Sequence, residues 1–140
     1  MRHLFLITTL VFAFILNATG QEQFSNPRLT VVNLFENVGD DNYNLTAAAK
    51  SLYRGDLSQK EIEKRARQLV QIYNGLGIQV DPSKISIDPN FRNKKTTAHE
   101  VLIDSLVAGI YVVKYHDEWL IKEESVEAIP SLFNETYPFG

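Results

Sequence analysis

The stretch LSQKEIEKRARQLVQIYNGLG, residues 57–77, is the most clearly defined element of the sequence. Ser58 and Glu61 have the spacing of a capping box, and Leu57 and Ile62 have that of a hydrophobic staple. Apolar side chains then recur on one helical face, at Ile62, Ala66, Leu69, Tyr73 and Leu76. The stretch therefore predicts an amphipathic helix that begins at the Ser58 cap and packs against a core.

Two glycines mark the end of this helix. Gly75 and Gly77 close the apolar pattern, and glycine is the residue that most often follows a helix. Glu61 and Arg65 are one turn apart, so a weak pair is expected on the solvent side, worth about 0.2–0.5 kcal/mol.

Two shorter helices are expected upstream. Asn26 is a good N-cap, and the proline after it suits the first helical position, so one helix is predicted over residues 27–37. Residues 39–42 have the composition of a turn. A second helix is predicted over residues 45–54, because three alanines favour it and Gly55 supplies a stop.

The helical period fades downstream. Residues 83–97 carry turn formers and a basic run, Arg92-Asn93-Lys94-Lys95, and are expected to form a surface connection. Residues 99–104 and 110–115 are rich in β-branched and other apolar residues, which predicts strands. A β-hairpin is expected between residues 110–115 and 119–122, with Trp119 and Ile121 on one face.

The last part of the chain predicts a helix with an interruption. Ser125 is expected to cap a helical turn through Ala128, and the helix is expected to kink or restart at Pro130, where a backbone hydrogen bond is lost. Leu132 and Phe133 then supply apolar anchors. The whole pattern predicts an α+β fold with three N-terminal helices, a small antiparallel sheet and a C-terminal helix.

The first twenty residues have the three parts of a secretory signal peptide. Arg2 is followed by a mainly apolar run over residues 4–16 and by the small residues Ala18-Thr19-Gly20. Cleavage is expected after Gly20, and the apolar run is shorter than the ~20 residues that span a bilayer. We expect residues 21–25 to be a flexible N-terminus and residues 26–140 to form one domain.

Composition excludes several classes of site. The sequence has no cysteine, which excludes a disulfide framework, a thiolate zinc site and a catalytic thiol, and in a small exported domain this favours a bacterial envelope protein. After removal of the signal peptide, which holds Arg2 and no acid, the net charge becomes −4. A mildly acidic domain has no electrostatic footprint for nucleic acid.

No candidate for catalysis or metal binding stands out. His99 lies beside Glu100 and His116 beside Asp117, but neither belongs to a zinc-binding motif, so both are expected at strand ends or turns. The pair Gly75 and Gly77 ends a helix and does not open one, as a phosphate loop would. The sequence therefore predicts no catalytic, cofactor-binding or metal-ligating residue, and no enzyme.

Paired charges and aromatic residues leave two further interpretations open. The acids at residues 40–41 and 123–124 and the basic run at 92–95 are expected on the solvated surface, with anion binding as the alternative for the basic run. Tyr111, Tyr115 and Trp119 are expected to pack in the core and across strands, and the alternative is that they line a cleft for a small apolar ligand.

The segment from Trp119 to Leu132, with its ESVEAIPSL stretch, and the ending Tyr137-Pro138-Phe139-Gly140 resemble a block in bacterial mechanosensitive ion channels of the small-conductance type. There an apolar strand, a turn and a tryptophan strand lead into a TVEAIPEL stretch and a YPFG ending. The similarity extends upstream through Asn26-Pro27, Thr30-Val31, Asn42-Tyr43, Ala48-Ala49, Gly75-Leu76-Gly77-Ile78 and Asp88-Pro89-Asn90-Phe91.

The resemblance implies an N-terminal extramembrane domain on the periplasmic side of the bacterial inner membrane, without catalytic chemistry and without cofactors. Its implied partners are channel subunits or membrane helices of the same family, with self-association as a further possibility. The family continues toward transmembrane helices where this sequence stops at Gly140, so the pore is not part of this chain. The alternative is a free-standing exported domain that binds a small ligand or another protein.

Overall fold

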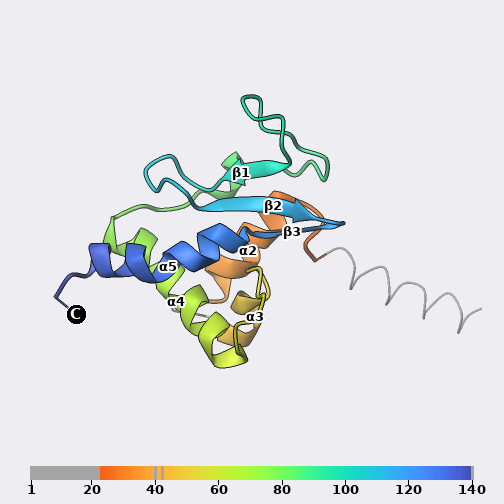
Figure 1. Ribbon diagram of the computed structural model, residues 1–140. Helices are drawn as coiled ribbons and strands as arrows, with labels where there is room; N and C mark the ends of the chain where they lie inside the picture. The colour runs from red at the N-terminus through yellow and green to blue at the C-terminus, as the bar shows by residue number, and fades with distance from the viewer. Residues whose placement is uncertain (1–22, 40, 42, 140) are drawn as a thin grey trace, which may run out of the picture.

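The described part of the chain runs through three α-helices, a 3-10 turn, three strands and a last α-helix (Figure 1). The computed structural model describes residues 23–39, 41 and 43–139, so the predicted signal peptide lies outside the described residues. The elements are α2 (Pro27–Glu36), α3 (Leu45–Ala49), α4 (Gln59–Gly75), the 3-10 turn η1 (Pro82–Lys84), β1 (Glu100–Leu102), β2 (Tyr111–Tyr115), β3 (Glu118–Ile121) and α5 (Glu123–Thr136). This order confirms the predicted α+β class.

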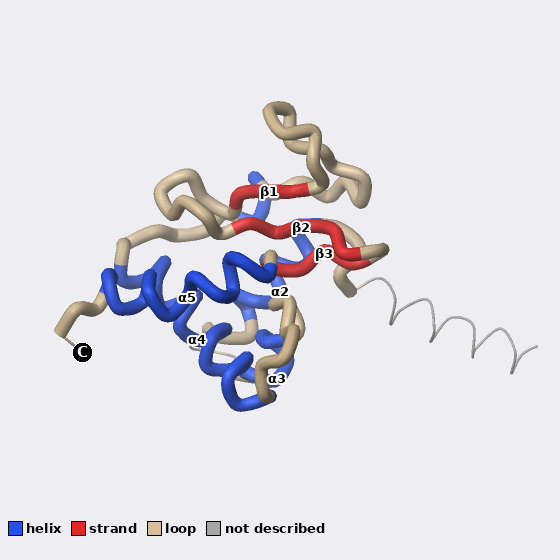
Figure 2. Tube along the Cα trace, in the orientation of Figure 1, coloured by secondary structure: helices blue, strands red, loops and turns tan. Residues whose placement is uncertain are grey.

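The three strands form an antiparallel sheet in the order β1-β2-β3, which Figure 2 shows beside the helices. The predicted hairpin is present, with Val112 opposite Ile121 and Lys114 opposite Trp119. Trp119 and Ile121 are fully buried on one face, as the alternation predicts, whereas Leu120 on the other face is half-buried. The sheet is therefore covered on the face that carries Trp119.

The free edge of β3 is closed first by the segment that follows α3. The Ile121 N–H donates to the Ser51 carbonyl at 2.8 Å, and the Tyr53 N–H donates to the Ile121 carbonyl at 3.0 Å. Leu52 forms an isolated parallel bridge with Ile121. The prediction of a helix as far as Arg54 is therefore wrong, because α3 ends at Ala49 and residues 51–53 extend along β3.

The same edge is closed further along by residues near the start of the described chain. The Trp119 N–H donates to the Phe24 carbonyl at 2.8 Å. The Thr30 hydroxyl, buried on α2, donates to the Trp119 carbonyl. Phe24 is itself buried, which corrects the expectation of a flexible stretch over residues 21–25 at this position, while residues 21 and 22 lie outside the described residues.

Helix α4 forms as its sequence predicts. The Ser58 hydroxyl oxygen accepts the Glu61 N–H at 3.1 Å, and the apolar face is buried against the core from Ile62 to Tyr73. Leu76 is the exception, because it follows the last helical residue and is 50% exposed. Burial of apolar surface is the dominant favourable term in folding, and this face contributes to it.

Helix α5 packs against α4, and the two run in the same direction. Arg65 on α4 contacts Val126 near the start of α5, and a side chain on Gly75 would meet Thr136 and Tyr137 at its end. A Cβ on Gly75 would lie 2.5 Å from the Tyr137 hydroxyl, which no real contact allows, so only glycine permits this approach.

The interruption expected at Pro130 does not occur as a restart, because α5 is one helix from Glu123 to Thr136. A proline at position 130 removes the hydrogen bond that the Val126 carbonyl would accept. Arg65 replaces it, since its Nη1 donates to that carbonyl at 2.9 Å. Arg65 is thus mostly buried against α5, with a side chain 17% exposed, although its 3.7 Å pair with Glu61 is present.

Candidate functional site

The two histidines among the described residues, His99 and His116, do not form a site together with acids. His99 is half-buried, with Nδ1 2.9 Å from the Phe91 carbonyl and its ring edge-on to Trp119. His116 is exposed in the two-residue turn between β2 and β3, at a left-handed φ of 56°. Residues 23–39, 41 and 43–139 contain no group of three or more His, Cys, Asp or Glu side chains that could hold a metal ion.

The paired acids lie on the surface. Asp41 is exposed, and Asp40 lies outside the described residues. Glu123 and Glu124 are exposed in the first turn of α5, where the helix dipole favours negative charge. The Glu123 N–H donates to the Tyr115 hydroxyl at 2.9 Å. This hydroxyl therefore accepts from one of the N–H groups at the helix start that have no partner within the helix.

The basic run forms an ordered surface loop next to β1, as Figure 1 shows. Asn93 organises the loop, because its Oδ1 accepts the N–H groups of Lys95 at 2.8 Å and Thr96 at 3.2 Å. Arg92 donates to the Thr97 carbonyl at 2.8 Å. Arg92, Lys94 and Lys95 are all exposed, which confirms a surface connection.

The three aromatic residues of the sheet do not line one cleft. Trp119 is fully buried on the inner face, where its Nε1 donates to the Pro89 carbonyl at 3.0 Å. Tyr111 and Tyr115 alternate onto the opposite face from Trp119. Tyr115 stacks on Tyr53 with 4.7 Å between ring centroids. The cleft hypothesis is wrong for this trio, because its members serve packing on two faces of the sheet.

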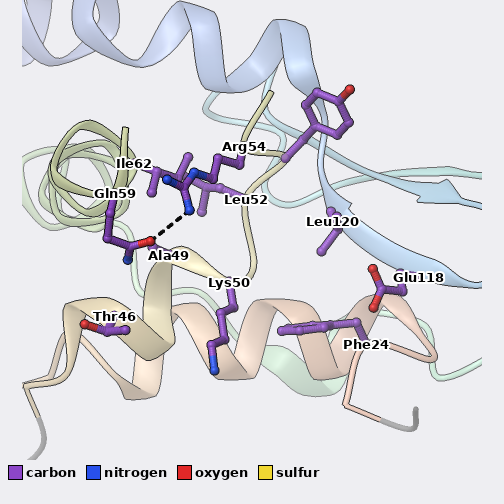
Figure 3. Close-up of a pocket in the computed structure, with 11 residues that line it drawn as sticks. Phe24, Thr46, Ala49, Lys50, Leu52, Arg54, Gln59, Ile62, Glu118 and Leu120 are labelled. Carbon is purple, nitrogen blue, oxygen red and sulfur yellow. Dashed lines mark hydrogen bonds between the residues drawn. The ribbon is translucent and has the colours of Figure 1, made fainter. Parts of the chain in front are cut away.

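A groove of about 510 Å³ lies instead between α3, the start of α4 and β3 (Figure 3). Its accessible surface is mainly apolar, and its polar side chains, apart from that of Tyr53, belong to exposed residues. Eleven residues line it: Phe24, Thr46, Ala49, Lys50, Leu52, Tyr53, Arg54, Gln59, Ile62, Glu118 and Leu120. A concave apolar surface of this size with a few polar groups is the usual form of a small-ligand site.

The fold positions this groove through the closed edge of β3. Residues 51–53 leave α3 and run beside β3, and this brings Leu52 next to the strand that carries Leu120. Phe24 reaches the same place because its carbonyl binds the Trp119 N–H. The lining residues come from separate stretches of sequence, so no local spacing signals the groove.

One buried polar group elsewhere in the described chain has no partner. The Tyr73 hydroxyl is the sole buried side-chain N or O atom without a hydrogen bond among the described residues. Burial, with a smaller contribution from the nearby Asp104 carboxylate, raises the pKa of Tyr73 well above its ordinary value. Tyr73 is fully buried in the core and does not line the groove.

No family model, curated protein or solved structure matches this chain. Across the described residues, the helices are too short or too polar for any of them to cross a membrane.

Proposed function

We propose that this chain is a non-catalytic extramembrane domain of a mechanosensitive ion channel of the small-conductance type, exported to the periplasmic side of a bacterial inner membrane. Its partners in this proposal are channel subunits or membrane helices of the same family. The domain carries no reaction, so replacing His99 or His116 by alanine is expected to leave its associations unchanged.

One observation carries the proposal: segments that share the resemblance, although far apart in sequence, contact one another. Gly75 of the GLGI segment packs against Tyr137 of the YPFG ending, whose hydroxyl donates to the Gln71 carbonyl at 2.8 Å. The Pro89 carbonyl accepts the indole N–H of Trp119. Residues quoted for the resemblance thus contact one another across the fold. This supports the proposal that the resemblance covers the whole domain and not a short motif alone.

The end of the molecule where α4 and α5 finish fits a role as the contact surface. Leu76 is 50% exposed, Tyr137 36% and Phe139 fully exposed. Neither helix has a basic residue in its last turn to offset the negative end of its dipole. Figure 1 places this end opposite the N-terminal start of the described chain. The proposal assigns this apolar end to contact with the channel.

The test is an immunoblot of fractionated native cells with an antibody raised against this domain. The proposal expects a band several times larger than the domain in the membrane fraction. A soluble envelope band at the size of the domain alone would contradict it.

The contact surface is tested in the same cells by chemical crosslinking of a tagged chain. Leu76→Glu is expected to reduce crosslinking to membrane-bound partners severalfold, because it puts a charge on the apolar end. Ile87→Glu is the matched control, since Ile87 is 59% exposed on a different segment and is expected to behave as wild type. Equal loss in both variants would contradict the assignment of this end.

The groove beside β3 favours a second candidate, a free-standing exported domain that binds a small ligand. Its apolar lining and rim of charged groups are the observation in favour of this candidate. A soluble band in the immunoblot would leave it as the better proposal.

A further inference from the structure

The groove beside β3 has a closed apolar floor. Ala49 is 5% exposed, Leu52 3% and Ile62 1%, so the floor is part of the packed core and does not need to form when a ligand arrives. Phe24 and Leu120 continue the apolar surface toward β3 (Figure 3). A preformed surface of this kind binds an apolar chain at a low cost in ordering.

The charged groups around this floor are not distributed evenly. Figure 3 shows Arg54 and Gln59 at the end next to α4, and Glu118 near Phe24 and Leu120 at the end next to β3. The first end also lies at the start of α4, where the helix dipole is positive. The groove therefore has a positive end and a negative end.

The cations of the groove lack carboxylate partners. Arg54 donates Nε to the Leu57 carbonyl at 2.8 Å and Nη1 to the Gln59 side-chain oxygen at 3.0 Å, both of which are neutral acceptors. Within the part of the chain that the structure describes, the Glu61–Arg65 pair is the only ion pair. Lys50 lines the groove as a further cation and is exposed. An anionic group at this end would gain charge-assisted hydrogen bonds without displacing an existing carboxylate.

We propose that the groove binds a single-chain amphiphile with one carboxylate, of the size of a medium-chain fatty acid. The carboxylate lies at the Arg54 end, and the tail lies along Leu52 toward Leu120. Glu118 at the far end disfavours a second carboxylate, so the site selects a monocarboxylate over a dicarboxylate. The volume of about 510 Å³ lies within the ~300–1,000 Å³ common for small-ligand sites. This inference goes beyond the proposed function and does not depend on it.

The first test is an NMR titration of the purified protein with sodium decanoate below its micelle concentration. The expected result is saturable shifts of the residues that line the groove. Decyltrimethylammonium has the same tail and the opposite charge, and it is expected to bind at least about tenfold more weakly because its cation would meet Arg54. Decanedioate is expected to be weakened by the same factor, because its second carboxylate would meet Glu118. Equal binding of decanoate and the cationic amphiphile would overturn the proposal.

The second test uses charge variants in the same titration. Arg54→Gln is expected to weaken decanoate binding by about tenfold, the effect of losing one charged hydrogen bond. Lys50→Glu is expected to weaken it by a similar factor, because it replaces a cation on the groove lining with an acid. Lys64→Glu makes the same charge change as Lys50→Glu on the exposed side of α4, outside the groove, and is expected to bind as wild type. Among the described residues the Lys50 side chain has no ion pair or hydrogen-bond partner, and its backbone N–H is kept in the variant, so Lys50→Glu stays interpretable where Arg54→Gln fails to fold.

Other occupants of the groove would appear in the same experiments and would overturn the proposal. Shifts of the groove residues that depend on protein concentration alone would mean that a second copy of the chain occupies it. Binding to phosphatidylglycerol vesicles without binding of free decanoate would mean a membrane surface. Decanoate shifts that are unchanged in both Lys50→Glu and Arg54→Gln would mean that the carboxylate does not lie at the cationic end.

Discussion

Helices α4 and α5 lie side by side, run in the same direction and have similar lengths of 17 and 14 residues, but different contacts define where they begin. The start of α4 is held by its own neighbours in sequence, through the Ser58 side chain. The start of α5 has no side-chain cap, although Lys122 has dihedral angles of −57° and 144°, close to the −67° and 163° of Ser58.

Helix α5 relies on groups from other elements. The Tyr115 hydroxyl on β2 accepts the Glu123 N–H, and Arg65 on α4 occupies the Val126 carbonyl that Pro130 leaves open. Ser125 is buried in the first turn and connects α5 to the sheet, because its hydroxyl accepts the Tyr111 N–H at 3.0 Å and donates to the Gly109 carbonyl at 2.7 Å. One helix is therefore specified locally and the other by the tertiary structure around it.

The largest effect is expected from removing the Arg65 hydrogen bond to the Val126 carbonyl, which Pro130 leaves without its helical donor. Arg65→Met keeps much of the apolar stem but leaves the Val126 carbonyl without a partner, and we expect it to lower the free energy of unfolding by about 2–3 kcal/mol. In a Pro130→Ala background the backbone N–H returns, so the same change is expected to cost about 1 kcal/mol or less. Urea denaturation of the four proteins of this cycle measures the difference, and equal costs in both backgrounds would show that Arg65 does not replace the lost bond.

A smaller effect is expected at the two helix starts. Ser58→Ala removes the cap of α4 and is expected to cost about 1 kcal/mol. Lys122→Ser places a capping oxygen in nearly the same geometry at α5 and is expected to stabilise the protein by up to ~1 kcal/mol. The loss of the cation–π contact between the Lys122 ammonium and the Tyr111 ring, 6.0 Å from its centroid, offsets part of this gain. Thermal unfolding compares the two variants, and a loss of stability in Lys122→Ser would mean that contacts other than a cap fix this end.

The smallest effect at neutral pH is expected at Tyr73, the one residue of α4 with an unsatisfied buried group. Tyr73→Phe removes a hydroxyl that has no partner, so stability is expected to change by less than ~0.5 kcal/mol or to rise slightly.

At alkaline pH the difference is expected to grow. The unfolded chain ionises tyrosine near pH ~10, whereas burial raises the pKa of Tyr73 in the folded protein. The unfolded state then holds fewer protons, so the stability of the wild type falls as the pH rises above about 10. The free energy of unfolding of Tyr73→Phe is expected to fall less than that of the wild type over the same pH range, and a measurement of this free energy against pH tests it. Tyr43→Phe is the control, because Tyr43 is 62% exposed.

The same contrast explains which parts of the fold were predictable. The Ser58 cap and the strand alternation at Trp119 are signals between near neighbours, and both are confirmed. The Glu61 carboxylate, which a full capping box would turn back to the Ser58 N–H, pairs instead with Arg65. The end of α3 and the continuity of α5 depend on partners more than fifty residues away, Ile121 for Tyr53 and Arg65 for Val126. Helix propensity at Ala47–Ala49 overestimated α3, because pairing along β3 outweighed it.

The candidate groove was less accessible to prediction than the fold. Its floor residues carry the ordinary apolar pattern of a core, and Lys50 and Arg54 look like any surface cations in the sequence. Only the closure of β3 by residues 24 and 51–53 brings these side chains around one surface. The aromatic residues that the composition suggested as a ligand cleft are instead divided between two faces of the sheet.

The closed edge of β3 also sets how far the N-terminus can be trimmed. The cleavage that the sequence predicts after Gly20 would leave the Phe24 carbonyl in place on the Trp119 N–H. A protease that cut past Phe24 would uncover this donor and the neighbouring apolar surface at once, and an exposed strand edge beside apolar side chains is a template for aggregation. The point at which the N-terminal segment is cut would therefore determine the solubility of the domain.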